Sequence, residues 1–324
     1  MREESSLKAV VVGLGRIGQL YDLGKKALIA THARAYAKHA GYQLLAGVDP
    51  DPAKRRIFEK TYHKPAYTGL KDLPAGTQPD VISICLPTPK HARAVQNALD
   101  FSPRAILCEK PIASTLAEAR KILVLCRKKH CLLVVNYMRR FEPAVQGIRA
   151  LIRSGKLGDV IKGVVWYGNG ILNNGSHYIN LLEYWLGGVR EIQILKKGPV
   201  KIDPEPDLRI RFGKTDVYFL AFDPQCYTAL HLELLTAKGK IAYLNRGAET
   251  YFQVKAGDKV FPGYEILGDR KHPLKNDYDN YQWHVVEHLR RVLHRREKNL
   301  RSDGASALAT LKVVHAIRGK LERV

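Results

Sequence analysis

Short apolar runs, each followed by glycine or polar residues, recur through the first 137 residues of the chain. Runs such as VISICL and AILCE are apolar almost throughout, which is typical of parallel strands covered by helices on both faces. Strands are therefore expected at about 7–12, 43–48, 80–86, 104–109 and 131–136, with helices between them. The alternation predicts an α/β domain over residues 1–137, with a Rossmann-type, doubly wound parallel sheet.

The alternation changes after about residue 137. A helix expected at about 142–154 is followed by the strand VIKGVVWYG, by a helix starting near Gly175, and by the strand-like runs LRIRF, DVYFLAF and ALHLELLTA. These runs predict a second, α+β domain over residues 138–324 with a mainly antiparallel, open sheet. A last helix is expected from Ala305 to Leu321, after the start signal Ser302-Asp303-Gly304, and it is left open whether this helix packs back on the first domain.

Length and composition are those of an ordinary globular protein. With 324 residues the chain exceeds the size of one hydrophobic core, so two domains are expected. Its five cysteines form no C-x-x-C pair and lie mainly in apolar segments, which favours a reducing cytoplasm and predicts no metal site. We also expect no membrane span and no signal sequence, because the apolar runs are short and the first one suits a strand.

The formal charge of +22 raises the question of an anionic partner. The basic residues are scattered, and in the cluster from Arg290 to Arg296 they fall mostly opposite an apolar helical face formed by Val285, Val286, Leu289, Val292 and Leu293. A solvated helix face explains this cluster, and neither zinc-finger spacing nor an RNP motif supports nucleic-acid binding. An anionic small-molecule substrate remains compatible with the charge.

The first strand ends in the motif G-x-G-x-x-G, from Gly13 to Gly18. In this place Gly13 makes the tight turn, Gly15 lets the backbone approach a pyrophosphate, and Gly18 lets helix and strand pack closely. Arg16 and Ile17 complete the loop, whose N–H groups would bind the pyrophosphate at the helix start. A glycine turn without a ligand is the alternative.

The second strand ends at Asp49, where a carboxylate can bind the ribose hydroxyls of NAD and repel the 2′-phosphate of NADP. Asp49 lies 31 residues beyond Gly18, whereas the usual spacing is about 20. The excess has a visible source, because the segment from Gln19 to Thr31 interrupts the first helix as an insertion. The run Asp49-Pro50-Asp51-Pro52 could equally be a helix cap, and Arg55 and Arg56 could bind a phosphate, so NADP stays possible.

Polar residues also follow the other strands. Pro87, Thr88 and His91 follow the run VISICL, Glu109 and Lys110 follow AILC, and Asn136 follows CLLVV. Because the carboxyl ends of parallel strands meet at one edge, these residues are predicted to bind the cofactor there together with Gly13 and Asp49. For Glu109 and Lys110 an exposed ion pair is the alternative interpretation.

The second domain carries its own candidate residues in the stretch WYGNGILNNGSHYINLLEYWLGG. Asn173 and His177 lie four residues apart at the start of a helix, beside Asn174. They are either acid/base and substrate-contact residues or only helix-capping residues. Arg139, just after the run CLLVV, is a candidate substrate contact or a surface arginine.

Several of these motifs together resemble the Gfo/Idh/MocA oxidoreductases, the family of glucose–fructose oxidoreductase and inositol dehydrogenase. The resemblance rests on VVGLGRIG, HARAY, GVDPDPAKRR, PTPKHARAVQNAL, CEKPIASTLAEA, NYMRRFEP, NNGSHYINLLEYWLG and LRSDGASALATLKVVHAI. It implies that Lys110 contacts substrate and nicotinamide, and that His177 belongs to a D-x-x-x-H pair for acid/base chemistry. Asn173 stands where that pair has its aspartate, and an amide cannot take a proton.

The resemblance thus implies an NAD(P)-dependent dehydrogenase acting on a secondary alcohol of a sugar, nucleotide sugar or cyclitol, in a homodimer or homotetramer. In this interpretation His177 takes the hydroxyl proton and Lys110 stabilises the charge that develops on the oxygen. The missing aspartate also leaves room for a non-catalytic ligand sensor on the same fold. Tight cofactor binding without turnover would distinguish the sensor from the enzyme.

Overall fold

The computed structural model describes residues 5–199 and 202–323 and contains two compact units. The first unit runs to Phe141 and also takes in Asp279–Leu308, and the second comprises Glu142–Tyr278 and the chain from Ala309 onward. This division differs from the expected continuous second domain over 138–324. The reason is that helix α7, Tyr281–Leu293, buries Val285, Val286 and Leu289 in the core of the first unit.

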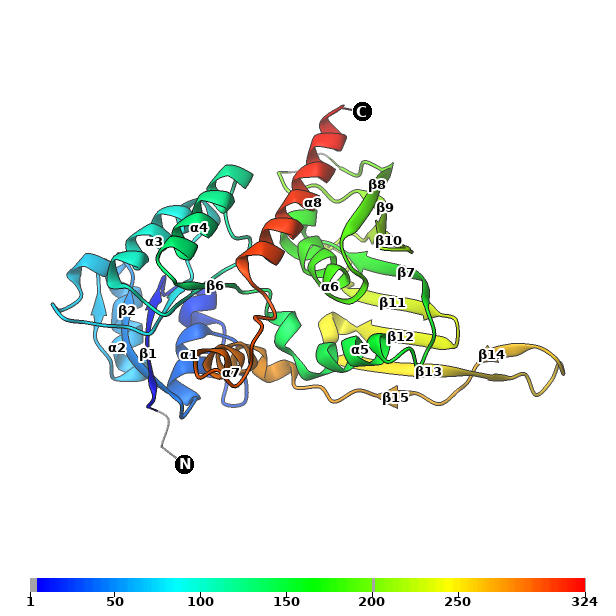
Figure 1. Ribbon diagram of the computed structural model, residues 1–324, viewed down its shortest axis with the longest axis horizontal. Helices are drawn as coiled ribbons and strands as arrows, with labels where there is room; N and C mark the ends of the chain where they lie inside the picture. Colours follow the sequence, from blue (N-terminus) through cyan, green and yellow to red (C-terminus); the bar gives the residue numbers. More distant parts are fainter. Residues whose placement is uncertain (1–4, 200–201, 324) are drawn as a thin grey trace. The chain divides into compact units, whose positions relative to one another are not determined.

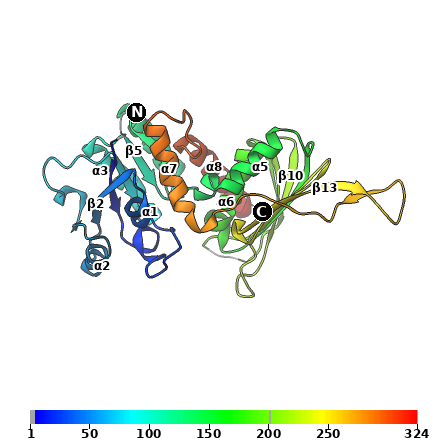
Figure 2. The same ribbon diagram turned by 90° about the horizontal axis from the view of Figure 1, so that it is seen from below.

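The first unit is the expected doubly wound domain. Its strands are β1 Leu7–Val12, β2 Tyr42–Val48, β3 Ala66–Tyr67, β4 Val81–Ile84, β5 Ala105–Cys108 and β6 Leu132–Val135, all parallel, in the order β3-β2-β1-β4-β5-β6. Its other helices are α1 His32–Lys38, α2 Pro52–Tyr62, α3 His91–Ala98 and α4 Leu116–Lys128. Figure 1 shows α3 and α4 on one face of the sheet and α1 with α7 on the other, an arrangement that Figure 2 shows from below. The strands are almost wholly buried, as expected for a sheet covered on both faces.

The helix after β1 is interrupted, as the sequence predicts. A π-helical turn, Arg16–Leu20, follows the glycine motif, and α1 begins only at His32. Between them the fully buried Asp22 accepts hydrogen bonds from the backbone N–H of Ala30, at 2.8 Å, and from the N–H and the hydroxyl of Thr31. Because a buried carboxylate must be hydrogen-bonded, these contacts fix the inserted segment on the domain.

The second unit is built on a nine-stranded sheet. Its strands are β7 Val160–Tyr167, β8 Val189–Lys196, β9 Asp207–Phe212, β10 Thr215–Ala221, β11 His231–Thr236, β12 Gly239–Leu244, β13 Glu249–Gly257, β14 Glu265–Leu267 and β15 His272–Pro273. The order is β14-β13-β12-β11-β7-β10-β9-β8, with β15 on β13, and only the β7–β10 pairing is parallel among the described pairs. The mainly antiparallel open sheet is therefore confirmed.

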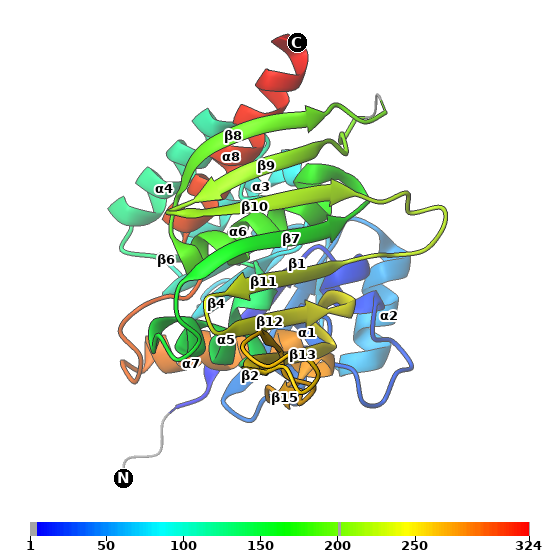
Figure 3. The same cartoon turned by 90° about the vertical axis from the view of Figure 1, so that its right-hand side faces the viewer.

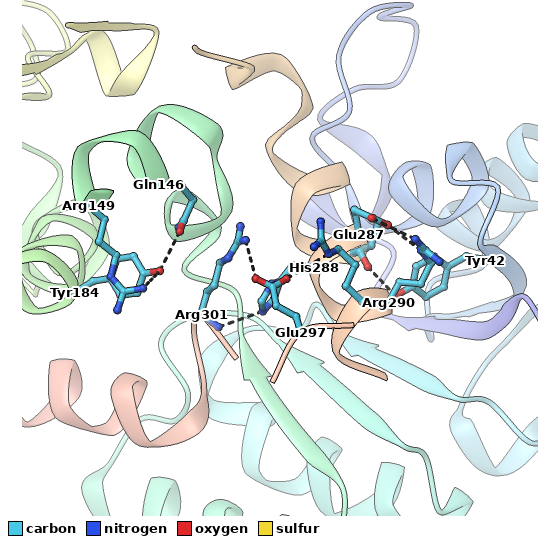
Figure 4. Close-up of polar contacts among 11 residues, drawn as sticks. Tyr42, Gln146, Arg149, Tyr184, Glu287, His288, Arg290, Glu297 and Arg301 are labelled. Carbon is cyan, nitrogen blue, oxygen red and sulfur yellow. Dashed lines mark hydrogen bonds and ion pairs between the residues drawn. The ribbon is translucent and has the colours of Figure 1, made fainter. Parts of the chain in front are cut away.

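One face of this sheet carries the helices α5 Pro143–Arg153, α6 Ser176–Leu186 and α8 Gly304–Arg323. Figure 3 looks onto the opposite face, with the three helices behind the strands. Side chains such as Val165, Ile210 and Leu234 fill the core between sheet and helices. At the surface of α5 and α6, the Arg149 guanidinium donates to the Tyr184 hydroxyl at 2.7 Å, and this hydroxyl donates to Gln146 at 3.2 Å (Figure 4). None of the helices that the structure describes is long and apolar enough to span a bilayer.

The arginine-rich end of α7 is only partly the solvated face that the sequence predicts. Arg291 is half exposed, but the Arg290 guanidinium is largely covered and pairs with Glu287 at 2.8 Å. Beside them the imidazole of His288 is buried (Figure 4). Its Nδ1 contacts the Glu297 carboxylate at 3.0 Å, and its Nε2 accepts the N–H of Arg301 at 3.2 Å. The imidazole is therefore neutral, with its proton on Nδ1.

This geometry predicts that the protein loses stability in mild acid. Burial and the positive charge of Arg301 lower the pKa of His288 from 6.5 to about 4. Between these values the unfolded chain binds a proton that the folded protein excludes, so the free energy of unfolding falls as the pH falls. We expect a loss of about 2 kcal/mol between pH 7 and pH 4.5 from this group, measured by urea unfolding.

Other groups act in the same pH range, and a variant isolates the contribution of His288. Burial also lowers the pKa of His39, with the same sign, whereas burial raises the pKa of Glu142, with the opposite sign. His288→Gln should flatten the pH dependence of stability relative to the parent protein. An equal slope in both proteins would contradict the assignment.

Candidate functional site

The glycine motif has the geometry that was predicted for Gly13 and Gly18. Gly13 has a φ of +95°, and a Cβ there would lie 2.6 Å from the carbonyl oxygen of Cys85. A Cβ on Gly18 would collide with the carbonyl oxygen of Gly13. Gly15 is different, since its Cβ would meet no described atom within 4 Å. The fold requires Gly13 and Gly18, whereas the open space at Gly15 fits the close approach of a pyrophosphate.

Asp49 lies directly beside this loop and is 5% exposed. Its Oδ2 accepts the N–H of Leu14 at 2.8 Å, and its Oδ1 accepts the N–H of Asp51 at 2.9 Å. The run Asp49–Pro52 does cap α2, but through Asp51, whose carboxylate accepts the N–H of Ala53, and not through Asp49. Arg55 donates to the backbone oxygens of Asp49 and Pro50. The first and second strands thus bring the glycine loop and the predicted ribose-binding carboxylate together.

The predicted residues after β4 lie partly in a turn and partly at the start of a helix. Thr88 and Pro89 begin a short 3-10 turn after Pro87, and α3 starts at His91. His91 is fully buried, and its two ring nitrogens contact the backbone oxygens of Leu86, at 2.7 Å, and of Pro111, at 2.9 Å. His91 therefore connects the loop after β4 to the loop after β5. Its contact with a cofactor stays a prediction.

Glu109, at the end of β5, is 9% exposed, so the alternative of an exposed ion pair is wrong. Its Oε1 contacts Nε2 of His32 at 2.9 Å and accepts from the amide of Asn136 at 2.6 Å. The other ring nitrogen of His32 contacts the Ser83 hydroxyl at 3.0 Å. Burial alone would raise the pKa of Glu109, but His32, Asn136 and the charge of Lys110 outweigh it and lower that pKa. The network places a buried negative charge directly before Lys110.

This network joins two predicted residues to three that the sequence analysis did not single out as site residues, namely His32, Ser83 and Gln282. Asn136 and Glu109 were predicted, and Asn136 also donates to Gln282 of α7 at 3.0 Å. His32 stands in the motif HARAY, but nothing in its spacing pointed to Glu109, which lies 77 residues away. No sequence pattern around Gln282 indicated that it would contact Asn136.

We expect His32→Leu to lower the free energy of unfolding by about 3 kcal/mol, because it leaves the Glu109 carboxylate buried without its imidazole partner. Replacing both residues, His32→Leu with Glu109→Leu, should recover most of the loss, since no uncompensated charge remains. Chemical denaturation of the two variants measures both effects. Ser83→Ala, which removes one neutral hydrogen bond, should cost about 1 kcal/mol. A double variant no more stable than His32→Leu would contradict the stabilising contact between the imidazole and the carboxylate.

In the second unit, His177 is the second residue of α6 and is 5% exposed. A π-helical turn, Gly170–Gly175, leads into α6, and in it Asn173 is exposed. The side chain of Asn174 donates to the carbonyl oxygen of Gly168 at 2.8 Å. The turn itself is held by Asp203, which accepts the N–H groups of Leu172 and Asn173. Asp203 was not predicted as a site residue. The run DPEPD, in which acidic residues alternate with prolines, was the one sequence feature that could have drawn attention to it.

Arg139 belongs to the first unit, in the 3-10 turn Met138–Phe141 that follows β6. It is 6% exposed, so the surface-arginine alternative is wrong. Its predicted contact with substrate stays a prediction. In the described ranges 5–199 and 202–323, no cluster of His, Cys, Asp and Glu could hold a metal ion.

The fold and the site define a two-domain, dinucleotide-binding protein, and comparisons with known proteins identify its relatives. The family model described as "Oxidoreductase family, NAD-binding Rossmann fold" (Gfo/Idh/MocA) matches residues 7–137. The rhizopine catabolism protein MocA of Rhizobium meliloti is 32% identical over 152 residues, which are 46% of this chain and 43% of MocA. Inositol 2-dehydrogenase of the same species is 29% identical over 150 residues, 46% of this chain and 42% of that enzyme. The chain thus spans under half the length of these curated relatives.

The fold similarity extends further than the sequence similarity. UDP-N-acetylglucosamine 3-dehydrogenase GnnA of Acidithiobacillus ferrooxidans has a TM-score of 0.77 at 15% identity, covering 98% of both chains. The WlbA dehydrogenase of Bordetella pertussis, solved with NADH and UDP-GlcNAcA, has a TM-score of 0.75 at 15% identity, covering 99% of this chain and 96% of WlbA. Residues 7–137 thus match the NAD-binding Rossmann domain of the Gfo/Idh/MocA oxidoreductases.

Proposed function

We propose that this protein is an NAD(P)-dependent oxidoreductase that transfers a hydride between the nicotinamide and a secondary alcohol of a sugar, nucleotide sugar or cyclitol. The observation that carries the proposal is the open space at Gly15, in a loop whose other glycines are required by packing. In the G-x-G-x-x-G motif the second glycine is the position at which the backbone approaches the pyrophosphate. The curated relatives, named as dehydrogenases of inositol and of other alcohols, support the same reaction class.

The cofactor would bind along the carboxyl edge of the parallel sheet. The N–H groups of the loop Gly13, Gly15, Arg16, Ile17 and Gly18 would hold the pyrophosphate. The Asp49 carboxylate, fixed by two backbone N–H groups, would accept the ribose hydroxyls and favour NAD over NADP. Pro87, Thr88, His91, Glu109 and Asn136 are proposed to complete the site. When bound, the nicotinamide supplies the hydride acceptor or donor.

Lys110 and His177 are the residues that we propose act on the alcohol. The Lys110 ammonium would donate to the alcohol oxygen and stabilise the negative charge that develops there. The His177 imidazole would take the hydroxyl proton. Asn173 cannot take this proton, so it would contribute a hydrogen bond only.

The test is a turnover assay with the purified full chain. NAD or NADP is mixed with a panel that includes myo-inositol, sugar acids and UDP-N-acetylglucosamine, and absorbance of the reduced cofactor is followed at 340 nm, roughly the maximum of its nicotinamide band. We expect turnover with at least one compound, and a loss of about 10³-fold in His177→Ala. Tight NADH binding without any turnover would favour a ligand sensor instead. Turnover unaffected in His177→Ala would remove the proposed role of that residue.

The net charge of +22 supports an anionic substrate, such as a nucleotide sugar or a sugar acid, with Arg139 and Asn174 as proposed contacts. The cytoplasm is the proposed compartment, because all five cysteines, each within the described ranges, are unpaired thiols. We further propose a homodimer or homotetramer formed through the open face of the sheet, where Ile161 and Trp166 are 57% and 40% exposed. Light scattering in solution would measure the mass.

A further inference from the structure

The turn that leads into α6 is held by an unusual set of hydrogen bonds. Four successive N–H groups, of residues 170–173, are accepted by the segment Asp203–Glu205. Gly170 donates to the Glu205 carboxylate at 3.1 Å, and Ile171 donates to the carbonyl oxygen of Pro204 at 2.9 Å. Leu172 and Asn173 donate to the two oxygens of Asp203, at 2.8 and 2.9 Å. N–H groups at a helix start have no partner within the helix, so this segment supplies partners to each of them in turn.

The backbone is shaped to admit the Asp203 carboxylate. Gly170 has a φ of +89°, and a Cβ there would collide with that carboxylate. Both oxygens of Asp203 are committed to adjacent N–H groups, so the carboxylate has one orientation. The Asp203 carboxylate is therefore held in a fixed position against the turn that leads into α6.

His177 lies four residues after Asn173 on the same helical segment. Side chains on a helix lean toward the N-terminus and cover the preceding turn, which here is the turn that binds Asp203. A fixed negative charge at this turn attracts the positive charge of an imidazole that has taken up a proton. Asn173, exposed and uncharged, supplies no such charge.

We propose that Asp203 is a positioning residue for His177: its carboxylate fixes the turn before α6 and provides the negative charge that stabilises the protonated imidazole. This inference rests on the proposed function of His177. The proposed step transfers one proton from the alcohol to His177, and Asp203 keeps its charge throughout.

Asp203→Asn tests the positioning role with little change in shape. An Asn side chain has one oxygen and one NH₂, so it can accept only one of the two N–H groups and opposes the other. Without any substrate, hydrogen–deuterium exchange at Leu172 and Asn173 should become at least about tenfold faster. In turnover with the most active compound of the panel, kcat should fall about 30-fold, while the affinity for NADH, titrated by fluorescence, stays within about twofold.

Asp207→Asn is the matched control, because the Asp207 carboxylate belongs to the same acidic run but accepts the N–H of Ala221 at 2.8 Å. It should leave kcat and the exchange at Leu172 and Asn173 unchanged. A carboxylate introduced four residues before His177 should replace the missing charge, since residues at this spacing are neighbours on a helix. Asn173→Asp in the Asp203→Asn background is therefore expected to recover at least about fivefold in kcat.

The outcomes separate this inference from the proposed function. If His177→Ala is inactive but Asp203→Asn exchanges and turns over like the parent protein, the role of Asp203 is overturned and that of His177 stands. If Asp203→Asn is slow and Asn173→Asp does not restore it, the loss comes from the broken turn alone, and the role of the charge is overturned. If His177→Ala is fully active, the proposed function of His177 itself is wrong, whereas the exchange result still decides whether Asp203 holds the turn.

Discussion

Lys110→Met is expected to lower kcat by about 10²–10³-fold while leaving the affinity for NADH within about threefold. Methionine keeps an unbranched, apolar side chain of similar reach and removes only the ammonium group. Lys110 is the second residue after β5, at the edge where the parallel strands end, and the buried Glu109 precedes it. The charge at position 110 is thus in a place where it would stabilise a developing alkoxide more than a ground-state alcohol.

The measurement is steady-state turnover with the most active compound of the panel, beside a fluorescence titration with NADH. Lys128→Met, at the exposed end of α4, is the control and should behave like the parent protein in both assays. Thermal unfolding of the two variants checks that neither has lost its fold. Unchanged kcat in Lys110→Met would contradict the role of its charge, whereas weakened NADH binding alone would assign Lys110 to cofactor binding.

The parallel sheet of the first unit, apart from the short strand β3, could be predicted from the sequence. Its strands β1, β2, β4, β5 and β6 are buried on both faces apart from a few positions such as Lys8 and Gln43, so each is a mainly apolar run. The same topology places the ends of these runs at one edge. Gly13, Asp49 and Glu109 could therefore be grouped without a structure, although they lie far apart in the sequence.

The second unit was predicted only in outline. Strand β8 alternates between half-buried and exposed side chains and is rich in charges, so it has no apolar run to detect. The hairpin of β13 and β14 was equally hard to predict, because most of its side chains are exposed. The placement of α7 in the first unit could not be predicted either, because an amphipathic helix shows which face is buried and not which core buries it.

Polar contacts between distant segments were missed for a different reason. His32 and Glu109, or Asp203 and Asn173, interact across 77 and 30 residues, and neither partner has a spacing that indicates the other. Such pairs depend on how the loops between strands fold back. The motif could therefore identify Asn173 and His177 as candidates but could not show that a carboxylate reaches this turn from another loop.

The glycine motif gives the second large effect, in a pair of variants that separates ligand binding from folding. Gly18→Ala should lower the free energy of unfolding by about 3 kcal/mol, because its Cβ would collide with the carbonyl oxygen of Gly13 in a part of the domain that packs tightly. Gly15→Ala should leave the free energy of unfolding within about 0.5 kcal/mol, since Gly15 has a φ of −80° and open space at its Cβ.

The affinity for NADH should respond in the opposite way. In Gly15→Ala the new methyl group would stand where the backbone approaches the pyrophosphate, so the dissociation constant is expected to rise at least about tenfold. Fluorescence titration with NADH and denaturation in urea measure the two quantities on the same samples. If Gly15→Ala bound NADH like the parent protein, the loop would be a turn without a ligand, and the dinucleotide would have to bind elsewhere on the sheet. Because the fold alone explains Gly13 and Gly18, the binding function of the loop depends on the result at Gly15.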